Sequence, residues 1–369
     1  MALFTDLELD RPPRPRRRLV GRIILVAAIV GLVVVALAPA PFVIEQPGPV
    51  YNVLGDVTVS GKQVPLIDIP SAKTFDTSGT LDMLTVSLVG DPGNLPNWLD
   101  IASATLDPSR AVVPIKEIYP PGYSVQDSNQ QGAVDMQNSQ QDAIAAALTE
   151  LGYTFSSTLT VASTEASGPA ATSLKANDVI VSVNGKTFTN VTDLRAEIAA
   201  NGTGKPADVV VERAGAQLTY QITPVQSAGA NSAPILGIVA GNKYDFPIDV
   251  TIQLQNVGGP SAGQMFALGI IDKLTPGALN GGKSIAGTGT ITAAGQVGPI
   301  GGIRQKMFGA RGSGATFFLA PQSNCDEVTG HIPSGLTVFA VSTLGDSLAA
   351  LKEISTGADT ANLPTCPAS

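Results

Sequence analysis

The chain has 369 residues, enough for two or three domains of ordinary size, and carries a formal net charge of -8 with only 14% charged residues. Its basic residues cluster only near the start, whereas a nucleic-acid-binding protein would show a basic stripe, so we expect no nucleic-acid partner. One His and two Cys exclude a zinc site built from several such ligands, and we expect no metal and no cofactor. The single His, His331, lies in a loop-like Gly-His-Ile-Pro stretch, so a Ser-His-Asp triad is disfavoured.

The first segment of the chain predicts where the protein lies. Residues 1–18 form a basic tail, and residues 19–44 are apolar apart from Arg22. Because about 20 apolar residues cross a bilayer as a helix, we expect a transmembrane anchor at 19–44. The basic flank favours a cytoplasmic N-terminus, so the predicted location is the cell membrane, single-pass, with an extracytoplasmic body. A cleaved signal peptide ending near residues 36–38 is the alternative.

The body of the chain divides into further parts. Residues 45–151 alternate short apolar runs with Pro and Gly, which predicts a β-rich N-terminal segment with a helical end at 137–151. From residue 233 to 355 strands alternate with helices, which is an α/β pattern, and 356–369 form a C-terminal tail. In an oxidising compartment the only two cysteines, Cys325 and Cys366, are expected to form a disulfide. Two free thiols are the alternative.

Residues 157–224 predict four strands and one helix. The run from Gly168 to Gly185, Gly-Pro-Ala-Ala-Thr-Ser-Leu-Lys-Ala-Asn-Asp-Val-Ile-Val-Ser-Val-Asn-Gly, followed by Asp193-Leu-Arg, resembles a PDZ domain. Such domains bind an extended peptide as an added strand, so the resemblance implies a peptide site at the strand that carries Leu159 and Val161. A PDZ fold used only as a spacer is the alternative.

A phosphate-binding pattern occurs in the last part of the chain. Residues Gly277 to Ser284 fit G-x-x-x-x-G-K-[ST] letter for letter. That chemistry requires the loop to follow a strand and open a helix. Here a helical stretch comes before the loop and a β-type run, 284–292, comes after it. We therefore interpret the segment as a Gly-rich turn with a solvated Lys283, and expect no ATP.

A candidate nucleophile lies between a predicted strand at 249–257 and a predicted helix at 262–274. The turn that joins them, Gly258-Gly-Pro-Ser-Ala-Gly263, places Ser261 beside backbone N–H groups that can hold an oxyanion. Ser261 as a helix N-cap is the alternative. A Ser hydroxyl needs a base to act as a nucleophile, and with His so scarce a neutral Lys is the candidate.

Among the nearby lysines, Lys306 has the placement that a base requires. A helix is predicted over 303–310, and Lys306 lies on its apolar stripe together with Ile303, Met307 and Ala310. Burial favours the neutral amine and lowers its pKa toward neutrality. The alternative is a lysine at the edge of the stripe that extends to solvent.

Three blocks in this part of the chain resemble the proteolytic domain of the Lon family, which are peptidases with a Ser-Lys dyad. The blocks are Gly259-Pro-Ser-Ala-Gly263, Thr288-Gly289 and Gly295-Gln-Val-Gly-Pro-Ile-Gly-Gly-Ile-Arg-Gln-Lys306. The resemblance implies that Ser261 is the nucleophile, that Lys306 is the general base and that Thr288 helps to orient the lysine. Gly259, Pro260 and Ala262 would support the turn.

The whole layout is similar to the membrane-anchored, PDZ-containing Lon-like proteins of bacteria, and the stretch 324–328 resembles their actinobacterial members. The resemblance implies an α+β multidomain protein with a single transmembrane helix, a β-rich segment, a PDZ domain and a Lon-type α/β proteolytic domain. It also implies ATP-independent cleavage of peptides or unfolded chains, with the PDZ domain recruiting or gating substrate, and assembly into homo-oligomers.

Two positions depart from the family pattern. Gly258 stands where an acidic residue usually precedes the nucleophile block, and Thr290 stands where the family has Glu. These departures leave a second function open, that of a catalytically silent, membrane-tethered PDZ peptide-binding adaptor.

Overall fold

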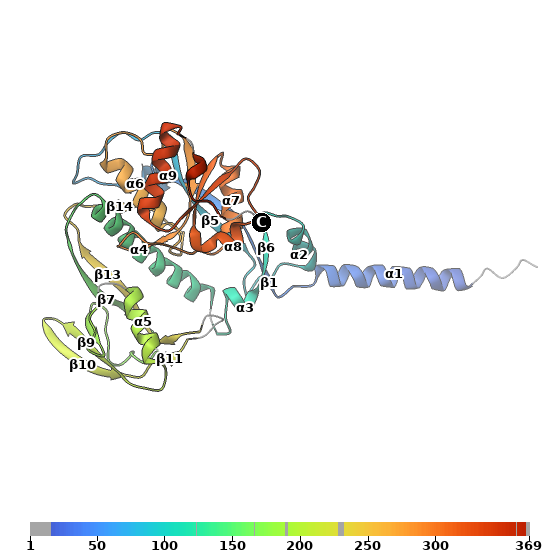
Figure 1. Ribbon diagram of the computed structural model, residues 1–369. Coiled ribbons are helices and arrows are strands. Elements are labelled where there is room, and N and C mark those ends of the chain that lie inside the picture. Colours follow the sequence, from blue (N-terminus) through green and yellow to red (C-terminus); the bar gives the residue numbers. More distant parts are fainter. Residues whose placement is uncertain are drawn as a thin grey trace, which may run out of the picture.

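The computed structural model describes residues 16–122, 124–165, 167–188, 191–227, 232–358 and 360–366. It shows an extended N-terminal helix, a large unit of mixed helix and strand, and a small β-rich unit (Figure 1). Most of the predicted basic tail, residues 1–15, and part of the predicted C-terminal tail lie outside the described residues.

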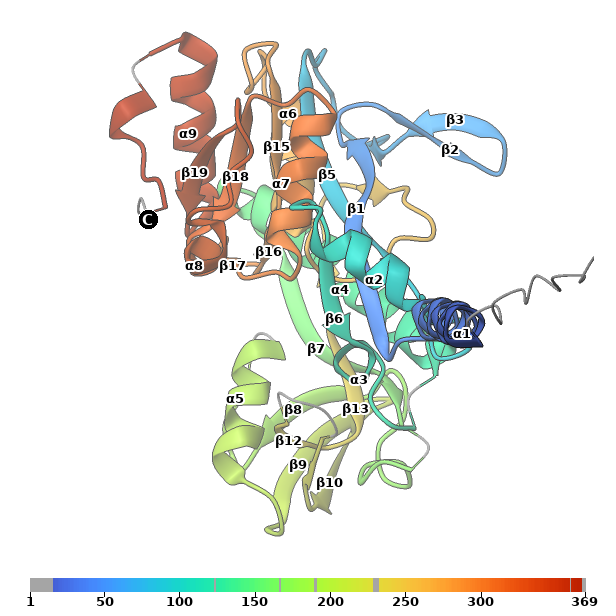
Figure 2. The same ribbon diagram turned by 90° about the vertical axis from the view of Figure 1, so that its right-hand side faces the viewer.

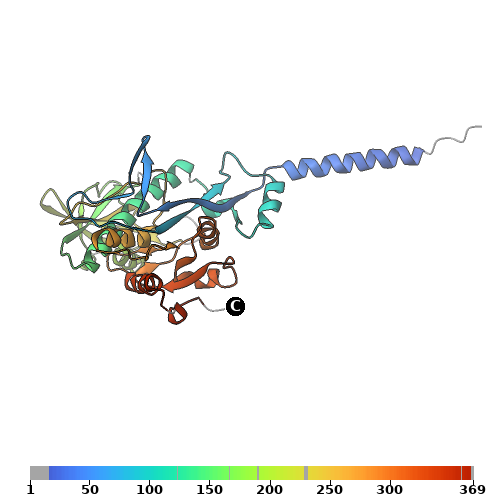
Figure 3. The same cartoon turned by 90° about the horizontal axis from the view of Figure 1, so that it is seen from above.

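The N-terminal helix α1 (Arg16–Leu37) stands apart from the rest of the molecule (Figure 3). Its stretch Val20–Leu37 is apolar apart from Arg22 and long enough to cross a membrane, and none of it is buried in the protein. Ile24 and Leu32, for example, are 63% and 72% exposed. The helix therefore fits a membrane span, and a signal sequence near the N-terminus would have the same properties.

A six-stranded mixed sheet forms the centre of the large unit, in the order β19-β18-β15-β5-β1-β6. Its strands are β1 (Phe42–Asn52), β5 (Thr80–Val89), β6 (Ala111–Pro114), β15 (Ser284–Gly287), β18 (Phe317–Pro321) and β19 (Thr337–Val341). The central strand β5 pairs with β1 in antiparallel and with β15 in parallel orientation. The predicted N-terminal segment 45–151 and the C-terminal domain are therefore not separate units, because strands from both make one sheet. A local apolar pattern contains no information on pairing over 200 residues of chain.

Helices cover both faces of this sheet, so the large unit has three layers (Figure 2). On one face α4 (Val125–Glu150), α6 (Gly263–Leu274) and α9 (Leu344–Thr356) enclose the larger core cluster. On the other face α7 (Ile303–Gly312) and α8 (Cys325–Val328) pack over a second cluster. Successive side chains of β18 point to opposite faces of the sheet, so Leu319 belongs to the first cluster and Phe318 to the second.

Helix α4 begins earlier than the sequence predicts. The helix was expected at 137–151, but it starts at Val125, where Ser124 and Asp127 form a reciprocal capping box. Its first half is rich in Gln and Asn and has no apolar stripe, so periodicity reveals only the second half.

Two predicted strands are shorter than expected. Of 249–257, only β14 (Thr251–Ile252) is a strand, paired with β4 (Ile67–Asp68). The extended path ends at Asn256, whose φ of 59° is left-handed. Of 284–292, β15 and the separate β16 (Thr290–Ile291) are strands.

The small unit is inserted into the large unit between α4 and β14. Its sheet has the order β10-β9-β8-β7-β13. The elements are β7 (Ser156–Thr164), β8 (Val179–Val183), α5 (Val191–Asn201), β9 (Ala207–Arg213), β10 (Ala216–Ile222), β11 (Val225–Gln226), β12 (Pro234–Ile235) and β13 (Ile238–Asp245). Strand β13 was placed in the last domain by the predicted boundary at 233, whereas it pairs with β7 and completes the small sheet.

Two chain crossings connect the small unit to the large one, and an aromatic cluster holds them together. Phe155 lies on the first crossing and Phe246 on the second, with ring centroids 5.1 Å apart. Tyr244 of β13 stacks on Phe246 and meets Phe155 edge-on. The two crossings are therefore packed against each other.

The C-terminal segment is held to the large unit by the cysteine pair. Cys325 and Cys366 lie at disulfide distance, with sulfur atoms 2.08 Å apart, as the sequence predicts. The remaining elements are short: β2 (Asp56–Val59), β3 (Lys62–Pro65), α2 (Trp98–Thr105), α3 (Ile115–Ile118), β17 (Val297–Gly298), and the 3-10 turns Gln322–Asn324 and Thr360–Asn362.

Candidate active site

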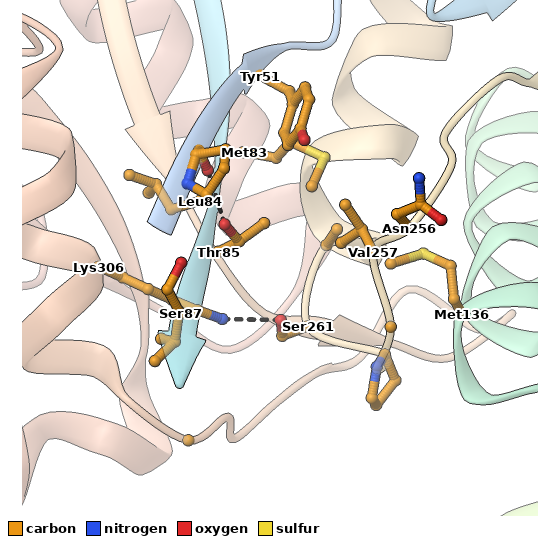
Figure 4. Close-up of a pocket in the computed structure, with 16 residues that line it drawn as sticks. Tyr51, Met83, Leu84, Thr85, Ser87, Met136, Asn256, Val257, Ser261 and Lys306 are labelled. Carbon is orange, nitrogen blue, oxygen red and sulfur yellow. Dashed lines mark hydrogen bonds between the residues drawn. The ribbon is translucent and has the colours of Figure 1, made fainter. Parts of the chain in front are cut away.

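A cavity of about 480 Å³ opens beside the second half of β5 (Figure 4). Leu84 to Ser87 of β5 form one wall, Met136 of α4 and the loop 256–262 form another, and Gly301 borders it near α7. Ser261 and Lys306 both line this cavity. The structure thus brings together two residues that lie 45 positions apart in the chain.

The turn that carries Ser261 is shaped by its glycines. Gly259 has a φ of +87°, a conformation that favours glycine. The residue at the N-cap of α6 is Ala262, and no side chain caps this helix. The alternative interpretation of Ser261 as an N-cap is therefore wrong, and its hydroxyl is free to take another partner.

That partner is Lys306. The Lys306 Nζ donates to Ser261 Oγ at 2.7 Å and to Thr288 Oγ1 at 3.1 Å. Thr288 Oγ1 in turn donates to the backbone oxygen of Ser261 at 2.9 Å. Thr288 follows β15 and is fully buried, so it fixes the amine and the serine backbone relative to each other.

Burial governs the charge of Lys306. The residue is only 3% exposed on the inner face of α7, as the apolar stripe predicts. Desolvation lowers its pKa to about 7, while the carboxylate of Glu45 on β1 acts in the opposite direction. Among the residues that the structure describes, no carboxylate lies within salt-bridge distance of this amine. A neutral amine beside a hydroxyl is the arrangement of a general base and a nucleophile.

Backbone N–H groups at the turn complete the site. Within the described part of the chain, neither the N–H of Ser261 nor that of Ala262 donates to another group of the protein. Both stand at the start of α6, where the helix dipole favours negative charge. They can therefore donate hydrogen bonds to an oxyanion. Pro260 and Ala262 contribute to the site through their backbone conformation and not through their side chains.

Helix α4 supports the turn, and sequence reasoning missed it. Gly259 N–H donates to Gly132 O at 2.8 Å, and Ser139 Oγ donates to Pro260 O at 2.9 Å. A Cβ at Gly258 would lie 3.2 Å from the Gly132 backbone, so the two segments touch main chain to main chain. No local signal marks Gly132, because it lies in the half of α4 that has no apolar stripe, outside the helix predicted at 137–151.

Other predicted residues lie elsewhere. Leu159 and Val161 are 2% and 1% exposed in the core of the small unit, so their assignment to a peptide site is wrong. Strand β7, which carries them, already has β8 and β13 on its two sides. His331 is in an exposed loop, and Lys283 is exposed in the loop between α6 and β15.

Comparison with known proteins gives two families. The family model of the Lon protease (S16) C-terminal proteolytic domain matches residues 179–353, and that of the PDZ domain matches residues 125–212. A Lon proteolytic domain and a PDZ domain are thus found in this chain.

Curated relatives agree with the first family. Lon protease 2 of Herpetosiphon aurantiacus is 34% identical over 153 residues, covering 40% of this chain and 17% of that protein. Lon protease 1 of Bacillus subtilis is 32% identical over 149 residues, covering 40% of this chain and 18% of that protein. The chain thus matches less than a fifth of the length of these two relatives. The similarity to Lon proteolytic domains supports the interpretation of this chain as a serine protease.

Among solved structures, the PDZ domain of an SdrC-like protein from Listeria monocytogenes is similar to part of this chain. It is 21% identical, covers 22% of this chain and 86% of that chain, and has a TM-score of 0.21.

Replacing Lys306 by Met should stabilise the fold, and more at low pH. The folded-state pKa of Lys306 lies below the ordinary lysine value of 10.5, so between these two values the unfolded chain binds more protons and the wild type gains stability as pH rises. Methionine has no such penalty. Urea unfolding near pH 6 should show a gain of roughly 1–4 kcal/mol that shrinks near pH 9.5. A gain that is equal at both pH values, or a loss at both, would show that the amine is not desolvated; the exposed Lys283→Met serves as the control.

Proposed function

We propose that this protein is an ATP-independent serine endopeptidase that uses a Ser261-Lys306 dyad. The observation that carries the proposal is the 2.7 Å hydrogen bond between a buried amine, whose pKa is about 7, and a hydroxyl that faces a cavity. The Lon proteolytic relatives support the same reaction class.

The reaction follows from this geometry. Ser261 Oγ attacks the scissile carbonyl while its proton passes to Lys306 Nζ. The N–H groups of Ser261 and Ala262 hold the oxyanion, and Lys306 then gives its proton to the leaving amine. Water hydrolyses the acyl-enzyme with Lys306 again as the base. Thr288 acts as a positioning residue, since it holds the amine on the side of the hydroxyl.

The edge of β5 supports an extended peptide as the substrate. Strand β15 ends at Gly287, opposite Met83, whereas β1 accompanies β5 to Val89. Beyond Met83, β5 therefore has a neighbouring strand on one side only, and this half of the strand lines the cavity. A substrate segment can pair with such an edge by main-chain hydrogen bonds, and an unfolded or flexible chain has free main-chain groups for this pairing.

The surroundings of the Gly-rich loop support the ATP-independent part of the proposal. Residues 277–284 follow α6 and lead into β15, the inverse of the order that phosphate binding requires. Substrates would therefore be peptides or chains that are already unfolded.

The small unit and α1 complete the proposal. The small unit, with its PDZ likeness, would recruit or gate substrate. A groove of about 170 Å³ between α5, β12, β13 and α4 is the site for this role in place of β7. Helix α1 would anchor the protein in a bilayer, with the body outside the cytoplasm.

Ser261→Ala and Lys306→Met should each reduce cleavage of an unfolded protein such as casein by at least about 1000-fold, because either change removes one partner of the dyad. Product formation is followed by gel and mass spectrometry, with a protein lacking residues 1–37 to keep the sample in solution. The matched control is Lys283→Met, a lysine change on the surface that should retain full activity.

Unchanged cleavage by Lys306→Met would overturn the dyad. If the wild type binds unfolded chains without cutting them, and Ser261→Ala binds them equally well, the adaptor function is favoured instead.

Activity should rise as pH increases through about 7, because Lys306 must lose its proton to act as a base. Replacing Glu45 by Gln removes a carboxylate that favours the charged amine, so the rise should move to lower pH. The measurement is kcat/KM against pH for both proteins. A profile that is flat from pH 6 to about 9, or a shift to higher pH in the variant, contradicts this role of the amine.

The full-length protein should remain with membranes after alkaline carbonate washing, because the side chains that α1 exposes over Val20–Leu37 are apolar apart from Arg22. External protease should then reach the large unit in intact spheroplasts. Release of a shortened, soluble body would instead show that the segment is a cleaved signal.

A further inference from the structure

Helix α4 touches two parts of the molecule that the chain keeps separate. One side of the helix holds the Ser261 turn through Gly132 and Ser139, as described above. Another side contacts β13 of the small unit. The same helix thus lies between the part of the large unit that carries the nucleophile and the inserted small unit (Figure 1).

The contact with β13 is polar and specific. Asn138 Nδ2 donates to Ala240 O at 3.3 Å. The Tyr244 hydroxyl donates to Asp142 Oδ1 at 2.7 Å, and Asn242 Nδ2 reaches the same oxygen at 3.4 Å. Burial raises the pKa of Asp142, whereas the hydrogen bonds from Tyr244 and Asn242 lower it. These hydrogen bonds therefore stabilise the partly buried carboxylate.

The backbone of β13 also comes close to the helix. A Cβ at Gly241 would lie 2.5 Å from Asn138 Oδ1. Strand β13 is the outer strand of its sheet, and α4 contacts it at Ala240 and Gly241. Asn138, Gln131 and Asp135 of α4 border the groove between α5 and β13.

The two sets of contacts are linked by helical geometry. Gly132 and Ser139 are seven residues apart and share one face, and Asn138 and Asp142 are four residues apart and share another. Asn138 and Ser139 are neighbours in the chain, so a rotation or shift that breaks the β13 contact also moves the hydrogen bond to Pro260 O.

We propose that docking of α4 on β13 holds the Ser261 turn in its reactive geometry, with Asn138 and Asp142 as positioning residues, so that the small unit controls turnover through this helix. The inference rests on the proposed function, since it assigns regulation to the same site. A displacement of about 1 Å at a reacting atom is enough to lower a rate about 100-fold. The dyad requires Ser261 Oγ to lie within hydrogen-bond distance of Lys306 Nζ, and α4 supports the turn that carries Ser261.

The first test undocks the helix. In the double variant Asn138→Ala/Asp142→Ala, hydrogen exchange in the segment 256–263 should become faster, because the Gly259 N–H loses a fixed acceptor. For a short peptide substrate, kcat should fall by about 10- to 100-fold while KM changes less than about twofold. The matched control is Gln137→Ala on the same helix, whose side chain is exposed and which should match the wild type in both measurements.

The second test locks the helix in place. Asn138→Cys/Gly241→Cys places two thiols where a disulfide can join α4 to β13. The oxidised protein should keep wild-type kcat and slow exchange at 256–263, and reduction should lower kcat and speed the exchange. Since reductant also opens the Cys325–Cys366 pair, the wild type with and without reductant is the control. This variant remains informative if the double alanine variant does not fold.

The outcomes separate the two proposals. If exchange and kcat are unchanged in the undocked variant and in the reduced cysteine variant, the coupling through α4 is overturned. If no wild-type cleavage is found but exchange at 256–263 still responds to undocking, the peptidase proposal fails and the coupling stands. If KM rises and kcat does not change, the small unit acts by holding substrate, which also overturns the inference.

Discussion

The desolvation of one amine is the constraint on which this site depends. Lys306 is enclosed by α7, the end of β15 and the Ser261 turn, and its polar contacts are two hydroxyl groups. A carboxylate in contact would keep the lysine charged, and open water would do the same, so the surroundings have to be polar enough to orient the amine and dry enough to neutralise it. The low exposure of Thr288 serves both requirements.

Strand β5 joins this site to the stability of the whole large unit. Its first half is central in the sheet, with Leu81 and Met83 packed in the larger core cluster. Its second half leaves the cover of β15 and becomes a wall of the cavity. The cleft is therefore built where the sheet loses a neighbour, and its wall is fixed by the part of the strand that is fully packed.

Sequence reasoning reached the residues whose roles are local and missed those that depend on strand order. The apolar stripe around Lys306 and the Gly-rich turn at Ser261 are visible within ten residues, and the structure joins them. The assignment of Leu159 and Val161 to a peptide site was wrong because the local pattern does not reveal that β13, which begins at Ile238, pairs with their strand β7. The support from α4 was also invisible, since Gly132 and Ser139 contact a turn more than a hundred residues away.

The paired chain crossings at Phe155 and Phe246 have a mechanical consequence. A domain joined by one linker can rotate about any axis. Two chain crossings that pack side by side instead restrict the rotation of the small unit to about one axis. Such a rotation would carry β13 toward or away from α4 along one path, so the small unit would approach the helix in a single orientation.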